Sequence, residues 1–337
     1  MRELAFSGLH GHTPSFFMAN IDQDSIAKRN LSRAYDAAFE SSDGYRDTLP
    51  DPQNADTPAE LDTSAMIQRV GISNFRLPLK IKGAGGNVQT LEASIVGTVP
   101  CAAGRRGINM GRIMRVFYAY KDREFSPQLL EEILKDYCKE VSADLAQLKV
   151  SFSYPILLPA LRSGLEGFQF YKCAFEGRYS KSAGFRAGIE FDFVYSSACP
   201  CSADLSDHAE ETRQVYAVPH SQRSKARIWL TLAQGANIDL EDAQALCLRA
   251  LKTETQVMVR REDEQAFAEL NGANLKFVED AVRLLHKQLN AHPAIADFQI
   301  ACAHLESLHS HDAIAVMTKG IDGGFSGEFE QFSDLVV

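Results

Sequence analysis

Runs of residues typical of β-strands occur in neighbouring pairs along this chain. Residues 66–83 and 87–101 are rich in apolar and β-branched side chains, and Gly83, Gly85 and Gly86 supply the glycines of a hairpin turn between them. Three further pairs follow, namely 149–161 with 167–179, 184–198 with 225–236, and 297–307 with 312–318. Because consecutive strands usually lie side by side, the chain is expected to build antiparallel sheet.

Amphipathic segments separate these pairs of strands. The segment 126–148 opens with Ser126 and Pro127, a cap and a first-turn proline, and carries its apolar residues on one helical stripe. Helices are also expected over 239–253 and 274–292. The order strand-strand-helix-strand-strand is therefore repeated in secondary structure, although not in sequence. This predicts an α+β protein with two antiparallel sheets, each with helices on one face, and with a sheet face or edge that a second subunit can cover.

The length of 337 residues is enough for two domains with sizeable cores. Residues 1–60 are rich in Asp, Ser, Asn and Pro, and they are expected to form an irregular or partly ordered leader. The repeated pattern then predicts one module over 61–181 and a second over 182–320. Residues 321–337 are left as a C-terminal tail.

Composition excludes several classes of protein. No apolar run reaches the about 20 residues of a membrane span, and the N-terminus lacks the basic and apolar regions of a secretory signal. We therefore expect a cytoplasmic protein without a membrane partner. The net charge of −9 argues against a nucleic-acid partner. Seven scattered cysteines do not suggest a disulfide framework in a reducing compartment.

Two cysteines and a histidine stand out in the stretch from Tyr195 to Leu230. Pro200 cannot donate a ladder hydrogen bond, so the strand should end near Cys199 and Cys201. A thiolate and an imidazole are common zinc ligands, which makes Cys199 and His220 candidates, although their spacing matches no compact zinc finger. A nucleophilic cysteine activated by nearby cations and a pair of inert cysteines remain open as alternatives.

Other polar residues that could carry chemistry lie in separate clusters. Cations gather at Arg105, Arg106, Arg112 and Arg115 and again at Arg223, Lys225 and Arg227, where they could bind an anion or simply be solvated. Glu306, His309 and His311 lie between two strands and could transfer protons or bind a ligand. Glu264, after Arg260 and Arg261, fits the solvated start of a helix. Glu279 lies near the margin of an apolar helical stripe, where it could be solvated or reach into a pocket.

Five separated motifs resemble one family. "SSACPCS", "HSQRS", "RREDE", "KFVED" and "ESLHSH" occur in the order seen in the type IB GTP cyclohydrolases, the FolE2-like enzymes of tunnelling fold, across residues 62–318. The resemblance implies tandem tunnelling-fold modules that assemble into an oligomeric barrel. It also implies a homotetramer with sites at subunit interfaces. The implied reaction converts GTP and water to 7,8-dihydroneopterin triphosphate and formate.

The resemblance also assigns roles to individual residues. It implies a divalent metal, Zn²⁺ or Mn²⁺ with Fe²⁺ as a further candidate, bound by Cys199, His220, Glu264 and Glu306. Cys199 and His220 are also the core of the catalytic set, and His309 and His311 are the candidate proton carriers. Glu279 is expected to accept two N–H donors from guanine, and Arg105, Arg106, Arg112 and Arg223 are expected to bind the triphosphate.

One segment departs from the family pattern. Where the family has Lys-Gly-Thr-His-Met-Ser-Arg, this chain has Arg106, Ile108, Asn109 and Gly111 in place of the lysine, threonine, histidine and serine. The connection between Cys199 and His220 is also longer than usual, and it contains His208 as a second candidate ligand. Two alternatives therefore accompany the main hypothesis: a relative with an altered product or a modified purine nucleotide as substrate, and a non-catalytic purine- or pterin-binding protein.

Overall fold

The computed structural model describes residues 34–50 and 63–336. The chain divides into two compact units, Met1–Asp51 and Pro52–Val337. In the described part of the first unit, helix α2 (Asp43–Asp47) begins where the side chain of Ser42 accepts a hydrogen bond from the Tyr45 amide. The rest of the expected leader lies outside the described residues.

The described strands of the second unit form one sheet of nine strands. Their order across the sheet is β3-β1-β2-β4-β5-β6-β7-β8-β9, and every neighbouring pair is antiparallel except β1 with β3. The strands are β1 (Ile67–Lys82), β2 (Val88–Cys101), β3 (Glu124–Phe125), β4 (Leu145–Pro159), β5 (Glu166–Ser180), β6 (Gly184–Ala198), β7 (Ser221–Leu232), β8 (Ile295–His304) and β9 (Ala313–Thr318).

The prediction of two separate sheets is therefore wrong. β5 turns directly into β6, and the two strands pair from Cys173 opposite Phe191 to Ser180 opposite Gly184. Beyond Phe191, the partner of β6 on that side changes to another segment. The amide of Ser196 donates to the carbonyl of Thr253, and Tyr195 forms a bridge with Glu254. This segment closes the gap that β5 leaves near the site described below.

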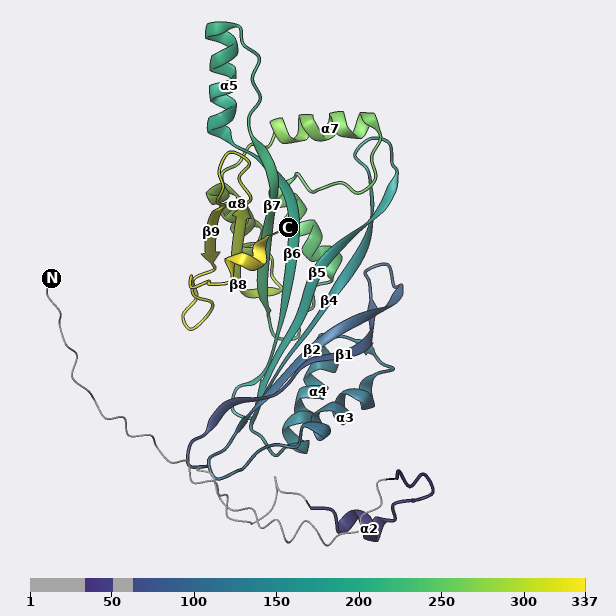
Figure 1. Ribbon diagram of the computed structural model, residues 1–337. Helices are drawn as coiled ribbons and strands as arrows, with labels where there is room; N and C mark the ends of the chain where they lie inside the picture. Colours follow the sequence, from purple (N-terminus) through teal and green to yellow (C-terminus); the bar gives the residue numbers. More distant parts are fainter. Residues whose placement is uncertain (1–33, 51–62, 337) are drawn as a thin grey trace, which may run out of the picture. The chain divides into compact units, whose positions relative to one another are not determined.

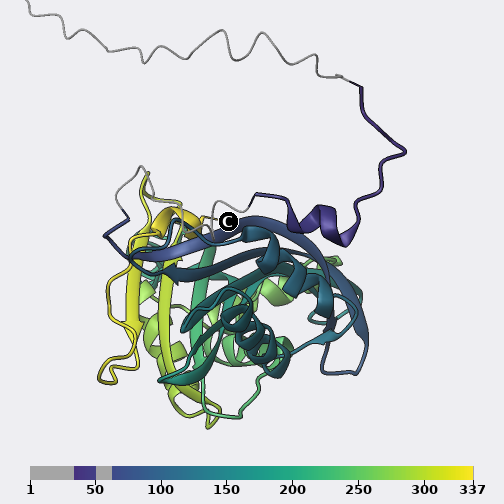
Figure 2. The same ribbon diagram turned by 90° about the horizontal axis from the view of Figure 1, so that it is seen from below.

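Helices cover one face of the sheet. They are α3 (Met110–Tyr120), α4 (Pro127–Glu140), α6 (Leu240–Leu251) and α8 (Val278–Asn290), and seen from below they lie together on one side of the sheet (Figures 1 and 2). Apart from β3, α5 and α7, the element order strand-strand-helix-helix-strand-strand thus occurs twice. Two more helices, α5 (Pro200–Arg213) and α7 (Arg261–Gly272), lie at the end of the sheet where β6 ends.

Helix α4 shows how the sequence sets this packing. The hydroxyl of Ser126 accepts a hydrogen bond from the Leu129 amide, and Pro127 occupies the first turn. A Cβ added at Gly177 of β5 would come within 2.7 Å of Leu130, so the helix approaches the strand closely only because that position is glycine. The helix ends at Glu140 rather than at the predicted residue 148, because Ser142 adopts a left-handed φ of 52° and β4 begins at Leu145.

The opposite face of the sheet is polar, and the C-terminal segment covers part of it. Even-numbered residues of β8, such as Phe298 and Ile300, face the helices, whereas Ala301 and Ala303 pack against the fully buried Leu335. Leu335 lies in the short helix η1 (Phe332–Leu335). Because side chains alternate along a strand, the segment that was expected to be a tail lies on the face away from the helices.

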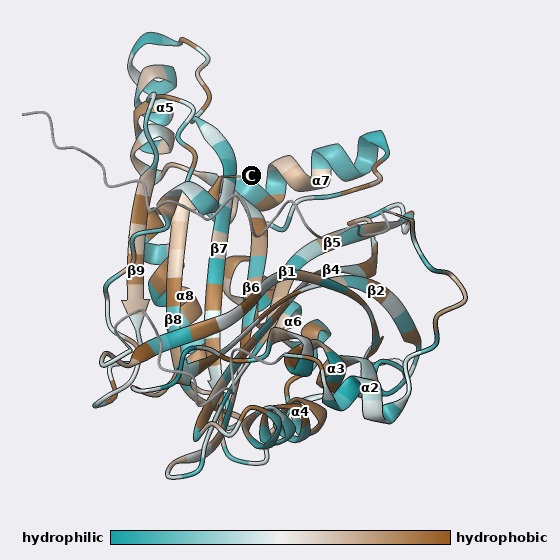
Figure 3. Cartoon of the chain, turned by 60° about the horizontal axis from the view of Figure 1, so that its bottom comes forward, coloured by the Kyte–Doolittle hydropathy of each residue, from teal (hydrophilic) through white to brown (hydrophobic). Residues whose placement is uncertain are grey.

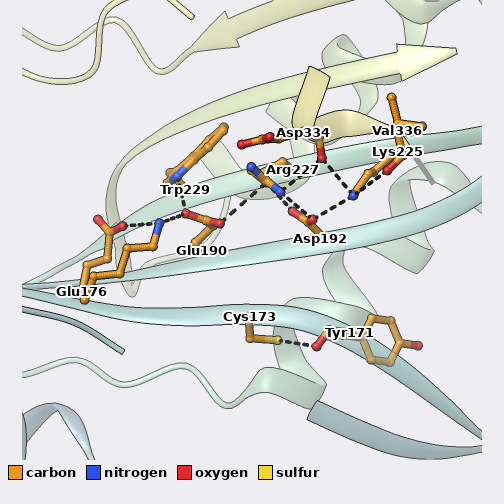
Figure 4. Close-up of polar contacts among 11 residues, drawn as sticks. Tyr171, Cys173, Glu176, Glu190, Asp192, Lys225, Arg227, Trp229, Asp334 and Val336 are labelled. Carbon is orange, nitrogen blue, oxygen red and sulfur yellow. Dashed lines mark hydrogen bonds and ion pairs between the residues drawn. The ribbon is translucent and has the colours of Figure 1, made fainter. Parts of the chain in front are cut away.

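A network of ion pairs runs beneath this segment (Figure 4). Arg227 makes a two-point contact with Asp192, and Lys225 lies 3.2 Å from the same carboxylate. Lys225 also donates to the main-chain carbonyls of Asp334 and Val336, at 3.1 and 3.2 Å. The buried cations therefore fix the end of the chain. None of the helices in residues 34–50 and 63–336 is both long and apolar enough to cross a membrane.

Candidate functional site

Cys199 and His220 meet where β6 ends and β7 begins. Ala198 is paired with Ser221 across the two strands, and the amide of Cys199 donates to the carbonyl of His220 at 3.2 Å. Pro200 then occupies the first turn of α5, for which Cys199 is the N-cap residue. The side chain of Cys199 is partly exposed, and that of Cys201 is exposed. The predicted break at the proline therefore brings the thiol of Cys199 to the same sheet end as the histidine.

His220 contacts the predicted ligand Glu306. The Nδ1 atom of His220 lies 3.3 Å from Oε2 of Glu306 and 3.1 Å from Oε1 of Gln222. The two side chains of the histidine and the glutamate are only 16% and 14% exposed. Glu306 comes two residues after β8, and β8 ends beside the start of β7 because the strands are antiparallel. Three predicted ligands thus come from three neighbouring strand ends.

The start of α8 lies at this end of the sheet as well. The amide of Lys276 donates to the carbonyl of Ala198 at 3.2 Å, and Asp280 caps the helix by accepting from the Phe277 amide. Glu279, the predicted guanine anchor, lies exposed in the first turn of α8. Its role as the guanine anchor stays a prediction.

Lys276 is a buried cation that the sequence analysis did not single out. It is 3% exposed, and its amine donates to Thr253 Oγ1 at 3.2 Å and to the carbonyl of Asn274. Burial lowers the pKa of Lys276 to about 8. Lys276 belongs to the same motif "KFVED" as Glu279. Membership of that motif was the one signal in the sequence that could have pointed to this lysine.

The predicted proton carriers His309 and His311 lie in the connection between β8 and β9. Their rings stack with centroids 4.8 Å apart, and both residues are exposed. This connection leaves β8 at the end where Cys199 and His220 lie. His208, by contrast, is nine residues along α5 from Cys199, or about 13 Å at 1.5 Å per residue. Figure 1 shows α5 extending away from the sheet, so His208 does not compete for the site in this chain.

Glu264 does not join the other predicted ligands. It is exposed on α7, whereas its neighbour Asp263 is fully buried and accepts hydrogen bonds from the amides of Arg162, Ser163 and Arg260. Burial alone would raise the pKa of Asp263, but these hydrogen bonds hold it well below its usual range. Within the described ranges, no three His, Cys, Asp or Glu side chains are placed together so as to hold a metal ion.

The arginines of the first half lie far from Cys199 in the same chain. Thr98 of β2 is aligned across the sheet with Arg186 of β6, through Gln147 and Arg178. Cys199 lies 13 residues beyond Arg186 in the chain. At a rise of about 3.3 Å per residue, Cys199 is therefore roughly 40 Å along the strands from the level of Thr98. Arg105 follows β2 at the far end of the sheet.

Two of these arginines have structural partners. Arg105 donates to the carbonyl of Val141 at 2.9 Å, and Arg112 donates to that of Glu140 at 3.1 Å, so both neutralise the C-terminal end of α4. Arg106 is exposed. Arg223 is also exposed, but it lies in β7 opposite Ser196, near the end that carries Cys199. One chain therefore brings only Arg223 of the predicted triphosphate ligands close to the predicted metal ligands.

A cavity of about 810 Å³ lies at the far end of the sheet. It is lined by the β5–β6 turn, the residues after β7 and the stretch 321–325, and it contains none of the predicted site residues. The candidate site is therefore defined by its chemical groups rather than by the size of a pocket.

The family model described as "Type I GTP cyclohydrolase folE2" matches residues 49–315. This chain belongs to that family. The relative from Paracoccus denitrificans (strain Pd 1222), "GTP cyclohydrolase FolE2", is 51% identical over 291 residues, 86% of this chain and 90% of the relative. A protein of the same name from Cereibacter sphaeroides (strain ATCC 17029 / ATH 2.4.9) is 46% identical over 312 residues, 92% of this chain and 86% of the relative.

Solved structures resemble this GTP cyclohydrolase family member only loosely. The uricase from Arthrobacter globiformis is 10% identical, with a TM-score of 0.45 over 79% of this chain and 97% of its own. A uricase from Bacillus fastidious also has a TM-score of 0.45, over 74% and 92% of the two chains. The assignment to the type I GTP cyclohydrolase folE2 family depends on the sequence matches.

The donor groups at the site fit the divalent metal that was expected for a type I GTP cyclohydrolase. A thiol, an imidazole and a carboxylate are the usual donors to Zn²⁺, and imidazole and carboxylate also suit Mn²⁺. Cys199, His220 and Glu306 supply these groups from adjoining strand ends. Glu264 remains a prediction, because a single chain leaves it exposed on α7.

Proposed function

We propose that this protein is a metal-dependent GTP cyclohydrolase, which converts GTP and water to 7,8-dihydroneopterin triphosphate and formate. One observation carries the proposal: in a chain of this family, His220 and Glu306 are in contact and Cys199 is joined to His220 by its amide. The start of α8, with Glu279, lies at the same end of the sheet. Three of the four proposed metal ligands therefore lie on adjoining segments at the end of the sheet where the helix with the proposed guanine anchor begins.

The proposed roles follow from the chemistry of each side chain. Cys199, His220 and Glu306, together with Glu264, would hold Zn²⁺ or Mn²⁺, with Fe²⁺ as a further candidate. When bound, the metal would lower the pKa of a water molecule and so supply a nucleophile near neutral pH. The carboxylate of Glu279 would accept two N–H donors of the guanine pyrimidine edge, which adenine does not offer in that pattern.

His309 and His311 are proposed to move protons during ring opening, loss of formate and ring closure. Their rings are exposed, and an imidazole can give or take a proton near neutral pH. The loop that carries them begins after His304 and also carries Glu306, so both rings lie on the same connection as a proposed metal ligand.

We further propose that a second copy of the chain completes the site. Arg105, Arg106 and Arg112 lie roughly 40 Å from Cys199 along the strands, so they can bind the triphosphate only if another subunit brings them. The sheet also has open edges in the described residues, because β1 pairs with β3 only at Lys80 and Ile81, and β9 has β8 as its one partner. Open edges favour pairing with another chain.

This arrangement corresponds to two tunnelling-fold modules in each chain, over 61–181 and 182–320, and to a homotetrameric barrel with sites at subunit interfaces. The repeated order of strands and helices supports the two modules. Glu264, which one chain leaves exposed, would then also meet the metal across an interface.

An altered product is the second candidate function. Asn109 stands where the family has a histidine, and its side chain accepts a hydrogen bond from the Arg112 amide as the N-cap of α3. This position therefore serves the helix start rather than proton transfer. The absence of a histidine at this position is compatible with a reaction that stops at a cyclic-phosphate pterin. It is also compatible with a reaction that uses a modified purine nucleotide.

The test is a product assay with the metal-loaded protein. GTP should yield formate and a product with the mass of 7,8-dihydroneopterin triphosphate, under one or more of Zn²⁺, Mn²⁺ and Fe²⁺. A different pterin mass would support the second candidate. GTP binding without any product would instead indicate a binding protein and contradict the proposal.

Sharing of sites between subunits has its own test. Cys199→Ala and Arg106→Ala should each abolish or strongly reduce turnover. If the two residues act in different subunits, dissociating and reassembling a mixture of both variants should restore part of the activity, because some sites then receive both intact residues. Failure of the mixture to recover, with the oligomer reformed, would place both residues in one chain or remove Arg106 from the site.

A further inference from the structure

Gln222 connects His220 to a buried row of hydroxyl groups. Its Oε1 lies 3.1 Å from Nδ1 of His220, and its Nε2 donates to Oγ of Ser197 at 2.7 Å. The hydroxyl of Ser197 is in turn 2.8 Å from that of Ser224. Gln222 is 9% exposed and both serines are fully buried, so these contacts are shielded from water. The predicted sites of the sequence analysis include none of these three residues.

The strands dictate this row. Ser197 of β6 is directly opposite Gln222 of β7, and Ser224 is two residues further along β7 on the same face. Each member therefore has a fixed backbone position, and the glutamine side chain is held at both of its polar ends. Because the side chain of Gln222 is fixed, it can in turn fix the orientation of the His220 ring.

The contacts define which nitrogen of His220 carries the proton. Nδ1 faces Oε2 of Glu306 at 3.3 Å as well as Gln222. Both atoms that face Nδ1 are oxygens placed to accept, so these contacts need the ring proton on Nδ1. The carbonyl oxygen of the Gln222 amide then accepts from the same N–H, and its NH₂ group points to Ser197. The lone pair is left on Nε2, so Glu306 must turn away from Nδ1 to bind the same ion, and Gln222 then remains as the acceptor of the Nδ1 proton.

We propose that Gln222 is a positioning residue that holds His220 with its proton on Nδ1, so that Nε2 is the atom that binds the metal. This inference rests on the proposed function, because it takes His220 to be a metal ligand. Histidine ligands generally donate their other ring N–H to a fixed acceptor, and loss of that acceptor typically weakens metal binding by roughly 10- to 100-fold. Ser197 and Ser224 hold the glutamine rather than the histidine.

The experiment compares two substitutions of one residue. Gln222→Met keeps the length of the side chain but removes the acceptor, whereas Gln222→Glu keeps an acceptor for the Nδ1 proton. Ser221→Ala is the matched control, because Ser221 lies between His220 and Gln222 and is exposed. Zinc affinity is measured by competition with a chromophoric chelator, and the ring nitrogens of the metal-free proteins are observed by NMR after ¹⁵N labelling of histidine.

The expected results separate positioning from a simple packing role. Gln222→Met should weaken zinc binding roughly 10- to 100-fold, although Glu306 can still accept the Nδ1 proton of the metal-free ring. Gln222→Glu should stay within a few-fold of the unchanged protein, and Ser221→Ala should equal it. A wild-type proton on Nε2, zinc binding that does not depend on His220, or a Gln222→Met variant with unchanged zinc affinity would each overturn the inference.

These measurements need no GTP, so they remain separate from the proposed reaction. A protein that fails to turn over GTP but shows the expected order of zinc affinities would refute the proposed activity alone. A protein that turns over GTP while Gln222→Met binds zinc normally would refute the inference alone.

Discussion

Glu254 has a buried side-chain carboxyl group. It is 4% exposed, the hydroxyl of Tyr171 donates to one oxygen, and the amide of Gln244 donates to the other at 2.7 Å. Burial raises the pKa of Glu254 to about 7, against the opposing effect of these two hydrogen bonds. The group is therefore close to half protonated at neutral pH, on the segment that replaces β5 as the partner of β6.

The raised pKa predicts how Glu254 affects stability. The folded pKa lies above the unfolded value of about 4.3, so the stabilising contribution is complete below pH about 4.3 and is lost as pH rises through 7. Over that window the loss should reach about 3.5 kcal/mol. Glu254→Gln removes the titration, so it should be more stable than wild type at pH 8 and close to wild type at pH 5. Urea unfolding at both pH values measures this, and an equal difference at both would contradict it.

Glu279 has an exposed carboxylate, so its removal should affect binding rather than folding. Glu279→Ala is expected to lower kcat/KM for GTP by roughly 100-fold or more, because buried N–H groups of the base would lose their partner. Metal content and unfolding midpoint should stay unchanged. Lys287→Ala, an exposed change on the same helix, is the control for α8. Loss of metal in Glu279→Ala would show that the residue has a different role.

At the scale of elements, sequence patterns predicted most of the packed strands and helices and missed helix α5, which packs little. The strands and the helices α4, α6 and α8 have one buried face, and that face creates the periodicity by which they were predicted. α5 buries only Ser206 and Ala209, so its segment has no apolar stripe, and Figure 3 shows it mostly hydrophilic. α3 does have a stripe through Ile113, Val116 and Phe117, but its arginines were interpreted only as a cation cluster.

The proximity of Cys199 and His220 was predictable for a related reason. Cys199 and His220 flank two strands that pair with each other, so they had to meet once the strands formed. The position of the early arginines depends on strand direction and register across the sheet, which local patterns do not contain. The continuation from β5 into β6 likewise cannot be read from two repeated halves, because each half looks complete by itself.

A buried carboxylate joins helix α7 to the β4–β5 turn. Asp263 accepts hydrogen bonds from the amides of Arg162 and Ser163 in the β4–β5 turn, and from the amide of Arg260 at the start of α7. Asp263→Ala leaves these donors without a partner, so it should lower the free energy of unfolding by about 3 kcal/mol. The turn should also become more sensitive to proteolysis.

The neighbouring Glu262 supplies the control for this change, because it is exposed on the same helical turn. Glu262→Ala should shift the unfolding midpoint very little. If both substitutions had the same effect, the charge of the helix start rather than the bonds of Asp263 would anchor α7.

Across the whole second unit, the two faces of the sheet are covered by different means. Helices cover one face with apolar side chains, whereas the stretch after residue 320 covers part of the other face with three kinds of contact. Phe329 packs on Trp229 with ring centroids 5.3 Å apart, Leu335 is fully buried, and Lys225 donates to the last carbonyls. This stretch lies beyond residue 315, where the family match ends. Its role therefore has to be argued from its contacts.

The single tryptophan of the chain reports directly on this segment. Trp229 donates from Nε1 to Glu190 at 3.0 Å and has Phe329 against its ring, so detachment of the segment would expose the indole to water. Leu335→Ser replaces the buried apolar anchor with a hydroxyl and is expected to shift tryptophan emission to longer wavelength and to increase quenching by acrylamide. Val336→Ser is the matched control, because Val336 is 58% exposed and its carbonyl still accepts from Lys225. If Leu335→Ser left emission and quenching unchanged, the hydrogen bonds that Lys225 and Arg227 donate to main-chain carbonyls of the segment would be sufficient to hold it without its apolar anchor.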